Sequence, residues 1–62
     1  MITVQNISYN ETVDLTSFTY IFEKSGYRQS SDETYTGQLT EAQIIERLQP
    51  EYEAWIERNQ IP

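Results

Sequence analysis

The 62-residue chain contains no cysteine and no histidine. Without cysteine it cannot form disulfide bonds, thiolate metal sites or a thiol nucleophile. Without histidine it lacks the side chain that most often acts as a general base, and the commonest metal ligand. Most familiar routes to catalysis and metal binding are therefore closed. We expect a protein that is not an enzyme and that holds no metal or other cofactor.

Basic residues are also scarce: four, against ten acidic residues, leave a formal net charge of −6. Affinity for nucleic acids depends mainly on Lys and Arg, and anionic membranes repel an acidic protein. No apolar run approaches the ~20 residues of a membrane-spanning helix, and the first residues lack the basic-then-apolar order of a signal peptide. We expect a cytoplasmic protein that binds neither nucleic acids nor membranes directly.

The length permits one small domain, residues 1–62. Its composition, 37% hydrophobic with 13% aromatic residues, is too apolar for a disordered chain. Two halves differ in character. Residues 1–38 have the composition of a sheet, and residues 39–60 have the pattern of a helix.

The first half is rich in Thr, Tyr, Phe, Ile and Val, which favour strands. Its apolar positions change parity near Gln5-Asn6, which predicts a bulge or a strand end there. Residues 9–12 are typical of a turn, residues 13–23 give the strongest strand signal, and Ser25-Gly26 predicts a tight hairpin turn. A third strand is expected over 27–36, interrupted or frayed at 29–32. The pattern predicts an antiparallel three-stranded meander.

The second half predicts one helix, from Glu41 to Asn59. Thr40 is a good N-cap, and Gln43 completes a capping box. At 100° per residue one face carries a continuous apolar stripe, formed by Ile44, Ile45, Leu48, Tyr52, Trp55 and Ile56. Pro50 lies about opposite this stripe, where a proline bends a helix at least cost.

These elements predict the α+β class: a β-β-β-α meander with one C-terminal helix, bent near Pro50 and packed on one face of the sheet. The central strand is apolar on both faces, and one helix covers only one. We expect its aromatic face to meet Tyr52 and Trp55, because aromatic rings make large, specific contacts. The aromatic face comprises Phe18, Tyr20 and Phe22.

The other face would then be left uncovered as an apolar patch, which usually marks an interface. Its expected members are Leu15, Ile21 and Val13, with Ile2 or Val4 beside them. The leading hypothesis is a small acidic, non-enzymatic interaction module, of a size and composition that suit a bacterial or phage accessory protein. It would bind another protein, or a second copy as a homodimer, through the uncovered sheet face or an edge.

Three glutamates, Glu46, Glu53 and Glu57, line up on the helix face opposite the apolar stripe. The simplest interpretation is a solvated acidic face that keeps the protein soluble. The alternative function is an acidic decoy: carboxylates along a rigid helix would imitate DNA phosphates and block a nucleic-acid-binding protein.

Overall fold

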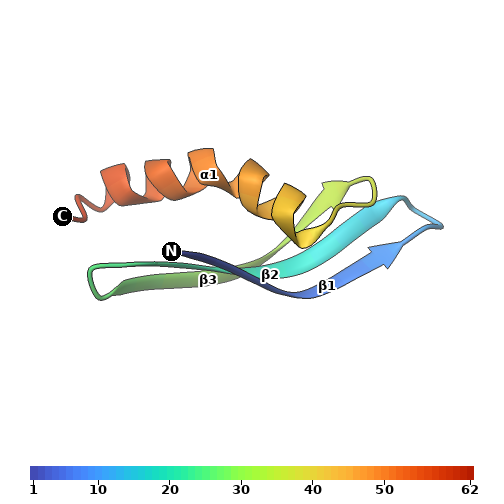
Figure 1. Ribbon diagram of the computed structural model, residues 1–62, viewed down its shortest axis with the longest axis horizontal. Helices are drawn as coiled ribbons and strands as arrows, with labels where there is room; N and C mark the ends of the chain where they lie inside the picture. The colour runs from blue at the N-terminus through green and yellow to red at the C-terminus, as the bar shows by residue number, and fades with distance from the viewer.

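The computed structural model describes all 62 residues as a three-stranded sheet and one helix. The elements are β1 (Ile2–Asn10), β2 (Leu15–Lys24), β3 (Tyr27–Thr36) and α1 (Glu41–Arg58). The strands lie in the order β1-β2-β3, and each neighbouring pair is antiparallel. Helix α1 lies along one face of the sheet (Figure 1). The predicted α+β meander with a C-terminal helix is confirmed.

The bulge and the tight turn predicted in the sheet are both present. The register of β1 against β2 shifts between Gln5 and Ser8, and Asn6 has a φ of 57°. Asparagine tolerates this left-handed conformation better than most residues. The β2–β3 hairpin turns at Ser25 and Gly26, whose φ values of 51° and 84° are those of a type I′ turn.

Three predictions about the strands were wrong. Tyr9 and Asn10 belong to β1, so the β1–β2 turn spans residues 11–14 rather than 9–12. β2 begins at Leu15 rather than Val13, because residues 11–14 form the β1–β2 turn. In this turn the Asn10 side chain accepts a hydrogen bond from the backbone N–H of Thr12 (3.0 Å). β3 is unbroken through residues 29–32, since every residue there pairs with β2. A central partner strand holds a polar segment extended despite its weak strand propensity.

Helix α1 begins where its capping signals predict. Thr40 Oγ1 accepts from the backbone N–H of Gln43 (3.3 Å), and Gln43 Oε1 accepts from the backbone N–H of Thr40 (2.8 Å). The helix continues through Pro50 and ends at Arg58, with Asn59 as its C-cap, one residue before the predicted end. It lacks the combination of length and apolar character needed to cross a membrane.

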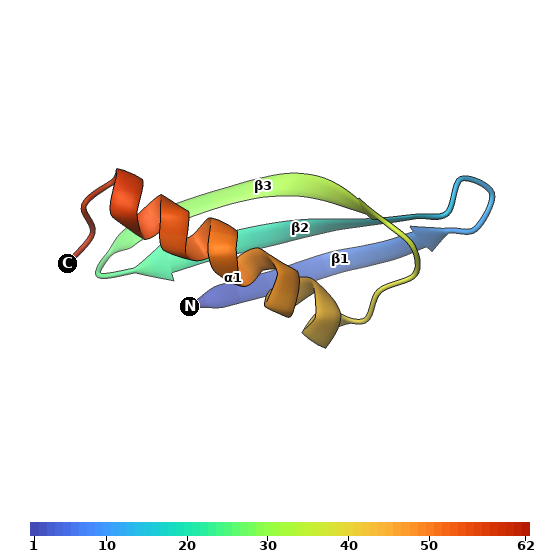
Figure 2. The same cartoon turned by 90° about the horizontal axis from the view of Figure 1, so that it is seen from above.

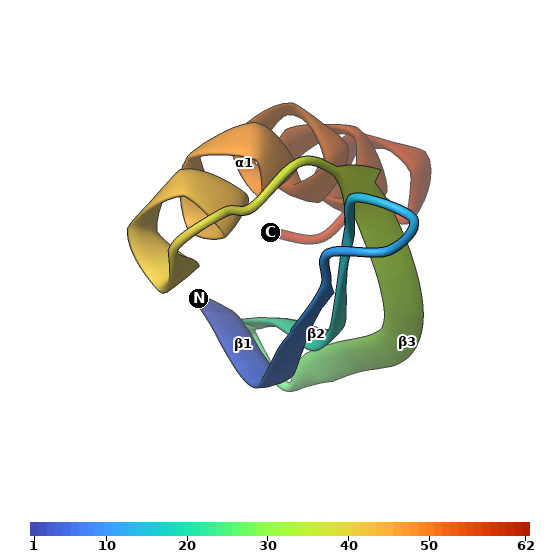
Figure 3. The same cartoon turned by 90° about the vertical axis from the view of Figure 1, so that its right-hand side faces the viewer.

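The core lies between α1 and one face of the sheet. Its buried apolar residues are Val4, Phe18, Tyr20, Phe22, Ile44, Leu48, Trp55 and Ile61. As predicted, the aromatic face of β2 meets the helix: the ring centroid of Phe22 lies 5.6 Å from that of Trp55 and 5.3 Å from that of Tyr52. From above, α1 crosses the sheet diagonally (Figure 2), and end-on the sheet curves beneath it (Figure 3).

Candidate functional site

The sheet face opposite α1 is mostly polar. The buried side chains of β2 occupy alternate positions and point toward the helix, so the intervening positions point away from it. The strand register then assigns the neighbouring residues to this uncovered face. Its members are Thr3, Gln5, Ser8 and Asn10 in β1, Leu15, Ser17, Thr19, Ile21 and Glu23 in β2, and Arg28, Ser30, Asp32, Thr34 and Thr36 in β3. Hydroxyl groups dominate it.

The three predicted interface residues do not gather into one apolar patch. Leu15 and Ile21 lie on the uncovered face and are half-buried, but Ser17 and Thr19 separate them along β2. At about 3.3 Å per residue their Cα atoms are roughly 20 Å apart. Val13 is 55% exposed and lies in the β1–β2 turn, outside the sheet.

Ile2 and Val4 were expected beside the uncovered patch, and this expectation is wrong. Val4 is buried in the core, and Ile2 packs against the core cluster. The bulge explains the placement, because an extra residue in β1 reverses which parity faces the helix. Val4 pairs with Tyr20 before the bulge and Tyr9 pairs with Thr16 after it, so even and odd positions of β1 reach the same face.

A shallow polar depression of about 380 Å³ lies on the uncovered face beside this bulge. Asn6 Nδ2 donates to Thr19 Oγ1 at 3.5 Å, and Thr19 Oγ1 donates to Asp32 Oδ1 at 2.6 Å. These side chains link all three strands in one chain of hydrogen bonds. The sequence predicted the bulge itself, but the link depends on the strand register and was missed.

The outer edge of β3 is a second exposed feature. All ten residues pair with β2 without a register break, and eight of them are exposed. In an antiparallel pair the backbone N–H and C=O groups point alternately toward the partner and away from it. Lys24 and Tyr27 flank the two-residue turn and form a hydrogen-bonded pair. Every second position from Arg28 onward therefore directs its backbone groups outward. β3 therefore presents a continuous row of unpaired donors and acceptors.

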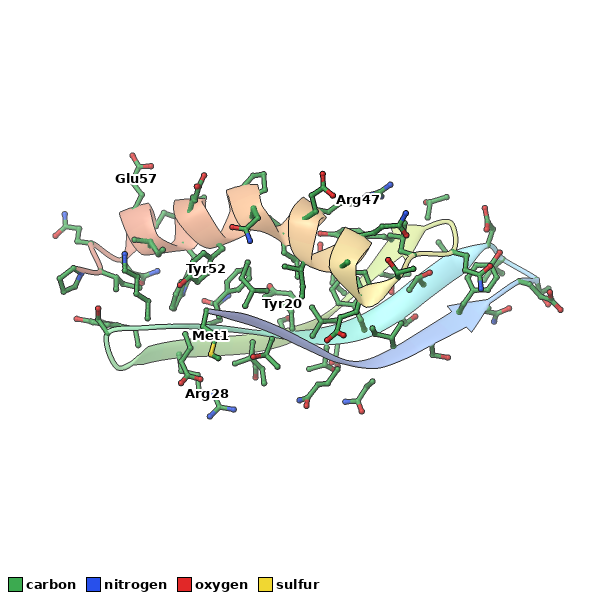
Figure 4. The ribbon with its side chains drawn as sticks, in the orientation of Figure 1. Met1, Tyr20, Arg28, Arg47, Tyr52 and Glu57 are labelled. Carbon is green, nitrogen blue, oxygen red and sulfur yellow. The ribbon has the colours of Figure 1, made fainter.

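The three glutamates of the predicted acidic face, Glu46, Glu53 and Glu57, are all exposed on α1. Glu57 points away from the sheet in Figure 4. Nowhere in the chain do three acidic side chains come close enough together to hold a metal ion.

A different acidic residue of the helix, Glu51, turns toward the sheet. Tyr35 Oη donates to Glu51 Oε2 at 2.8 Å, and the guanidinium of Arg47 lies 5.7 Å from the centre of the Tyr35 ring. Burial, followed by the hydrogen bond to Glu51, raises the pKa of Tyr35. Burial also raises the pKa of Glu33, with a smaller contribution from the negative charge of Glu51. This cluster joins β3 to α1.

Replacing Glu33 with glutamine is expected to stabilise the protein at pH 7 by a few tenths of a kcal/mol, the scale of a screened charge interaction. The folded pKa of Glu33 is raised above 4.5, so folding opposes its charged form. Wild-type stability attributable to this group is therefore highest below about pH 4.5 and falls as pH rises through the folded pKa. Urea unfolding of both proteins at about pH 3.5 and 7 measures the difference.

Glu53→Gln is the matched control, because it removes the same charge from an exposed position on the helix. The gain should belong to Glu33→Gln alone and should vanish at the acidic pH. An equal gain from the control at pH 7 would assign the effect to net charge.

Comparisons with protein-family models, with curated proteins and with solved structures found no significant match. The functional argument therefore depends on the geometry of this chain: a polar sheet face, an unpaired β3 edge and an acidic helix face.

Proposed function

We propose that the protein is a small non-enzymatic interaction module that binds a protein strand along the edge of its sheet. The observation that carries the proposal is the unpaired edge of β3, ten residues long and without a register break. An exposed edge is a template for another strand, and its backbone hydrogen bonds give affinity without an apolar surface.

The uncovered face is a weaker candidate than the edge. Its two apolar side chains, Leu15 and Ile21, lie at separate positions among hydroxyl groups. Burying this face against a partner would require new hydrogen bonds for many polar groups, because an unpaired buried polar group is costly. Strand addition at the edge leaves that face in water.

The test compares how an edge variant and a face variant retain a partner. Ser30→Pro removes an outward N–H from the middle of β3, and an outward edge position tolerates proline. Ile21→Glu places a charge in the middle of the uncovered face. We expect Ser30→Pro to reduce retention of a partner protein from source-cell lysate, or of a second copy, at least about ten-fold. Ile21→Glu should leave retention within about two-fold of wild type.

Circular dichroism and thermal unfolding confirm that both variants are folded. Retention lost only with Ile21→Glu would assign binding to the face, and it would overturn the edge proposal. A wild-type chain that retains no protein and does not self-associate would overturn the interaction function. A nucleic-acid-binding protein released by high salt, and lost when Glu46, Glu53 and Glu57 become glutamine, would support the acidic decoy instead.

A further inference from the structure

We propose that β3 pairs antiparallel with β3 of a second copy, in a register centred on Ser30, to form one six-stranded sheet. This inference rests on the proposed function and names the partner of the edge. The two-fold axis would pass through the sheet beside Ser30. Both α1 helices would then lie on the same face of the extended sheet.

The edge of β1 is less suited to this role. Its register shifts between Gln5 and Ser8, and the bulge interrupts the row of backbone groups that a partner strand would use. Its start is also held by the amino group of Met1, which donates to Glu23 O of β2 at 2.7 Å and to Tyr52 Oη of α1. The edge of β3 has no bulge, and all ten of its residues pair with β2 in one register.

The hydrogen-bonding pattern restricts the pairing. Arg28, Ser30 and Asp32 are positions whose backbone groups point outward from β3. Two copies can form backbone hydrogen bonds only when such outward positions face each other. The allowed registers therefore differ by two residues, and in all of them each side chain stays on the same face of the sheet. In the register centred on Ser30, Ser30 faces Ser30 of the other copy, and each Arg28 faces an Asp32 of the other copy. Three such pairs form about six backbone hydrogen bonds, two for each pair.

Charge selects this register among the allowed ones. Centred on Ser30, it places each Arg28 directly opposite an Asp32 of the other copy. A shift to either neighbouring register separates these charges, and centring on Asp32 or on Arg28 would oppose like charges. Opposite charges across strands stabilise the pairing, and like charges directly opposite destabilise it. The charges of β3 therefore discourage other pairings while favouring one.

The side chains are placed for these contacts. Arg28 lies on the face away from α1 (Figure 4), the same face as Asp32 in the β2–β3 register. Thr19 occupies only Oδ1 of Asp32, leaving Oδ2 to accept from an arginine. On the helix side, the same register places Tyr27, which is 50% exposed, opposite Glu33 of the other copy, within reach of its phenolic hydroxyl.

Sedimentation equilibrium of the full chain and two charge variants tests the register. At about 0.15 M salt, the wild-type mass should rise with concentration from 7.3 kDa toward twice that value. Arg28→Asp gives four mutually repelling aspartates at the interface, and Asp32→Arg gives four arginines. Each variant alone should dimerise at least about ten-fold more weakly than wild type. An equimolar mixture of the two should regain dimerisation, because every aspartate then faces an arginine.

Lys24→Asp and Glu11→Arg are the matched controls, since they make the same charge changes outside the paired residues; each should dimerise as wild type does. A wild-type chain that stays monomeric up to about 1 mM would overturn the self-pairing. Single variants as strong as wild type, or a mixture no stronger than its components, would overturn the register. Loss of a different retained protein with Ser30→Pro would still support the proposed edge function.

Discussion

Replacing Trp55 with alanine is expected to leave the chain largely unfolded at 25 °C. Trp55 is buried, and its ring lies 5.6 Å from that of Phe22 and 5.8 Å from that of Tyr52. Truncating a buried tryptophan costs about 3–5 kcal/mol. A core of this size rarely supplies more than about 3–5 kcal/mol of total stability. The loss is thus comparable to the whole free energy of unfolding.

Circular dichroism and amide NMR spectra measure this effect. The variant should show no cooperative thermal transition and a narrow spread of amide shifts. Tyr27→Ala is the matched control, because it also removes an aromatic ring but from a half-exposed position on β3. Trp55→Ala that unfolds cooperatively within about 1 kcal/mol of the control would contradict the central role of Trp55 in the core.

Local signals allowed the helix to be predicted nearly residue by residue. Thr40 and Gln43 form hydrogen bonds with each other across one helical turn, so their pairing does not depend on distant residues of the chain. The apolar stripe follows from the helical period alone, and every member of it contributes to the core. The aromatic face of β2 was predicted in the same way, from alternation within a single strand.

The uncovered face depends on relations between strands, which the sequence does not display. The parity change near Asn6 indicated a bulge, yet it could not show that Val4 and Tyr9 reach the same face on either side of it. The contact of Thr19 with Asp32 requires the β2–β3 register. For the same reason the sequence predicted an apolar patch at Leu15 and Ile21, where the structure places mainly hydroxyl groups. The sequence shows that β3 is polar, but this indicates an exposed edge strand only when the strand order is known.

Thr16 is the buried polar residue on which the loop before α1 depends, and no pattern in the sequence marks it for this role. It is 0% exposed and is the second residue of β2, beside the segment that leads into α1. Its Oγ1 donates to Gly37 O at 2.5 Å and accepts from the backbone N–H of Leu39 at 3.2 Å. One hydroxyl therefore satisfies a donor and an acceptor of the segment that joins β3 to α1.

Thr16→Val is expected to lower the free energy of unfolding by about 2–4 kcal/mol, because it preserves the shape of the side chain and leaves the carbonyl of Gly37 and the N–H of Leu39 without partners. Thr16→Ser is the matched control: it keeps the hydroxyl and loses one methyl group, at a cost of about 1 kcal/mol. Urea unfolding measures both losses, and hydrogen exchange at the Leu39 amide should accelerate most in the valine variant. A valine variant as stable as the serine variant would show that the loop is held by packing rather than by the hydroxyl. The expected order, wild type above serine above valine, would make Thr16 the anchor that fixes where the helix begins above the sheet.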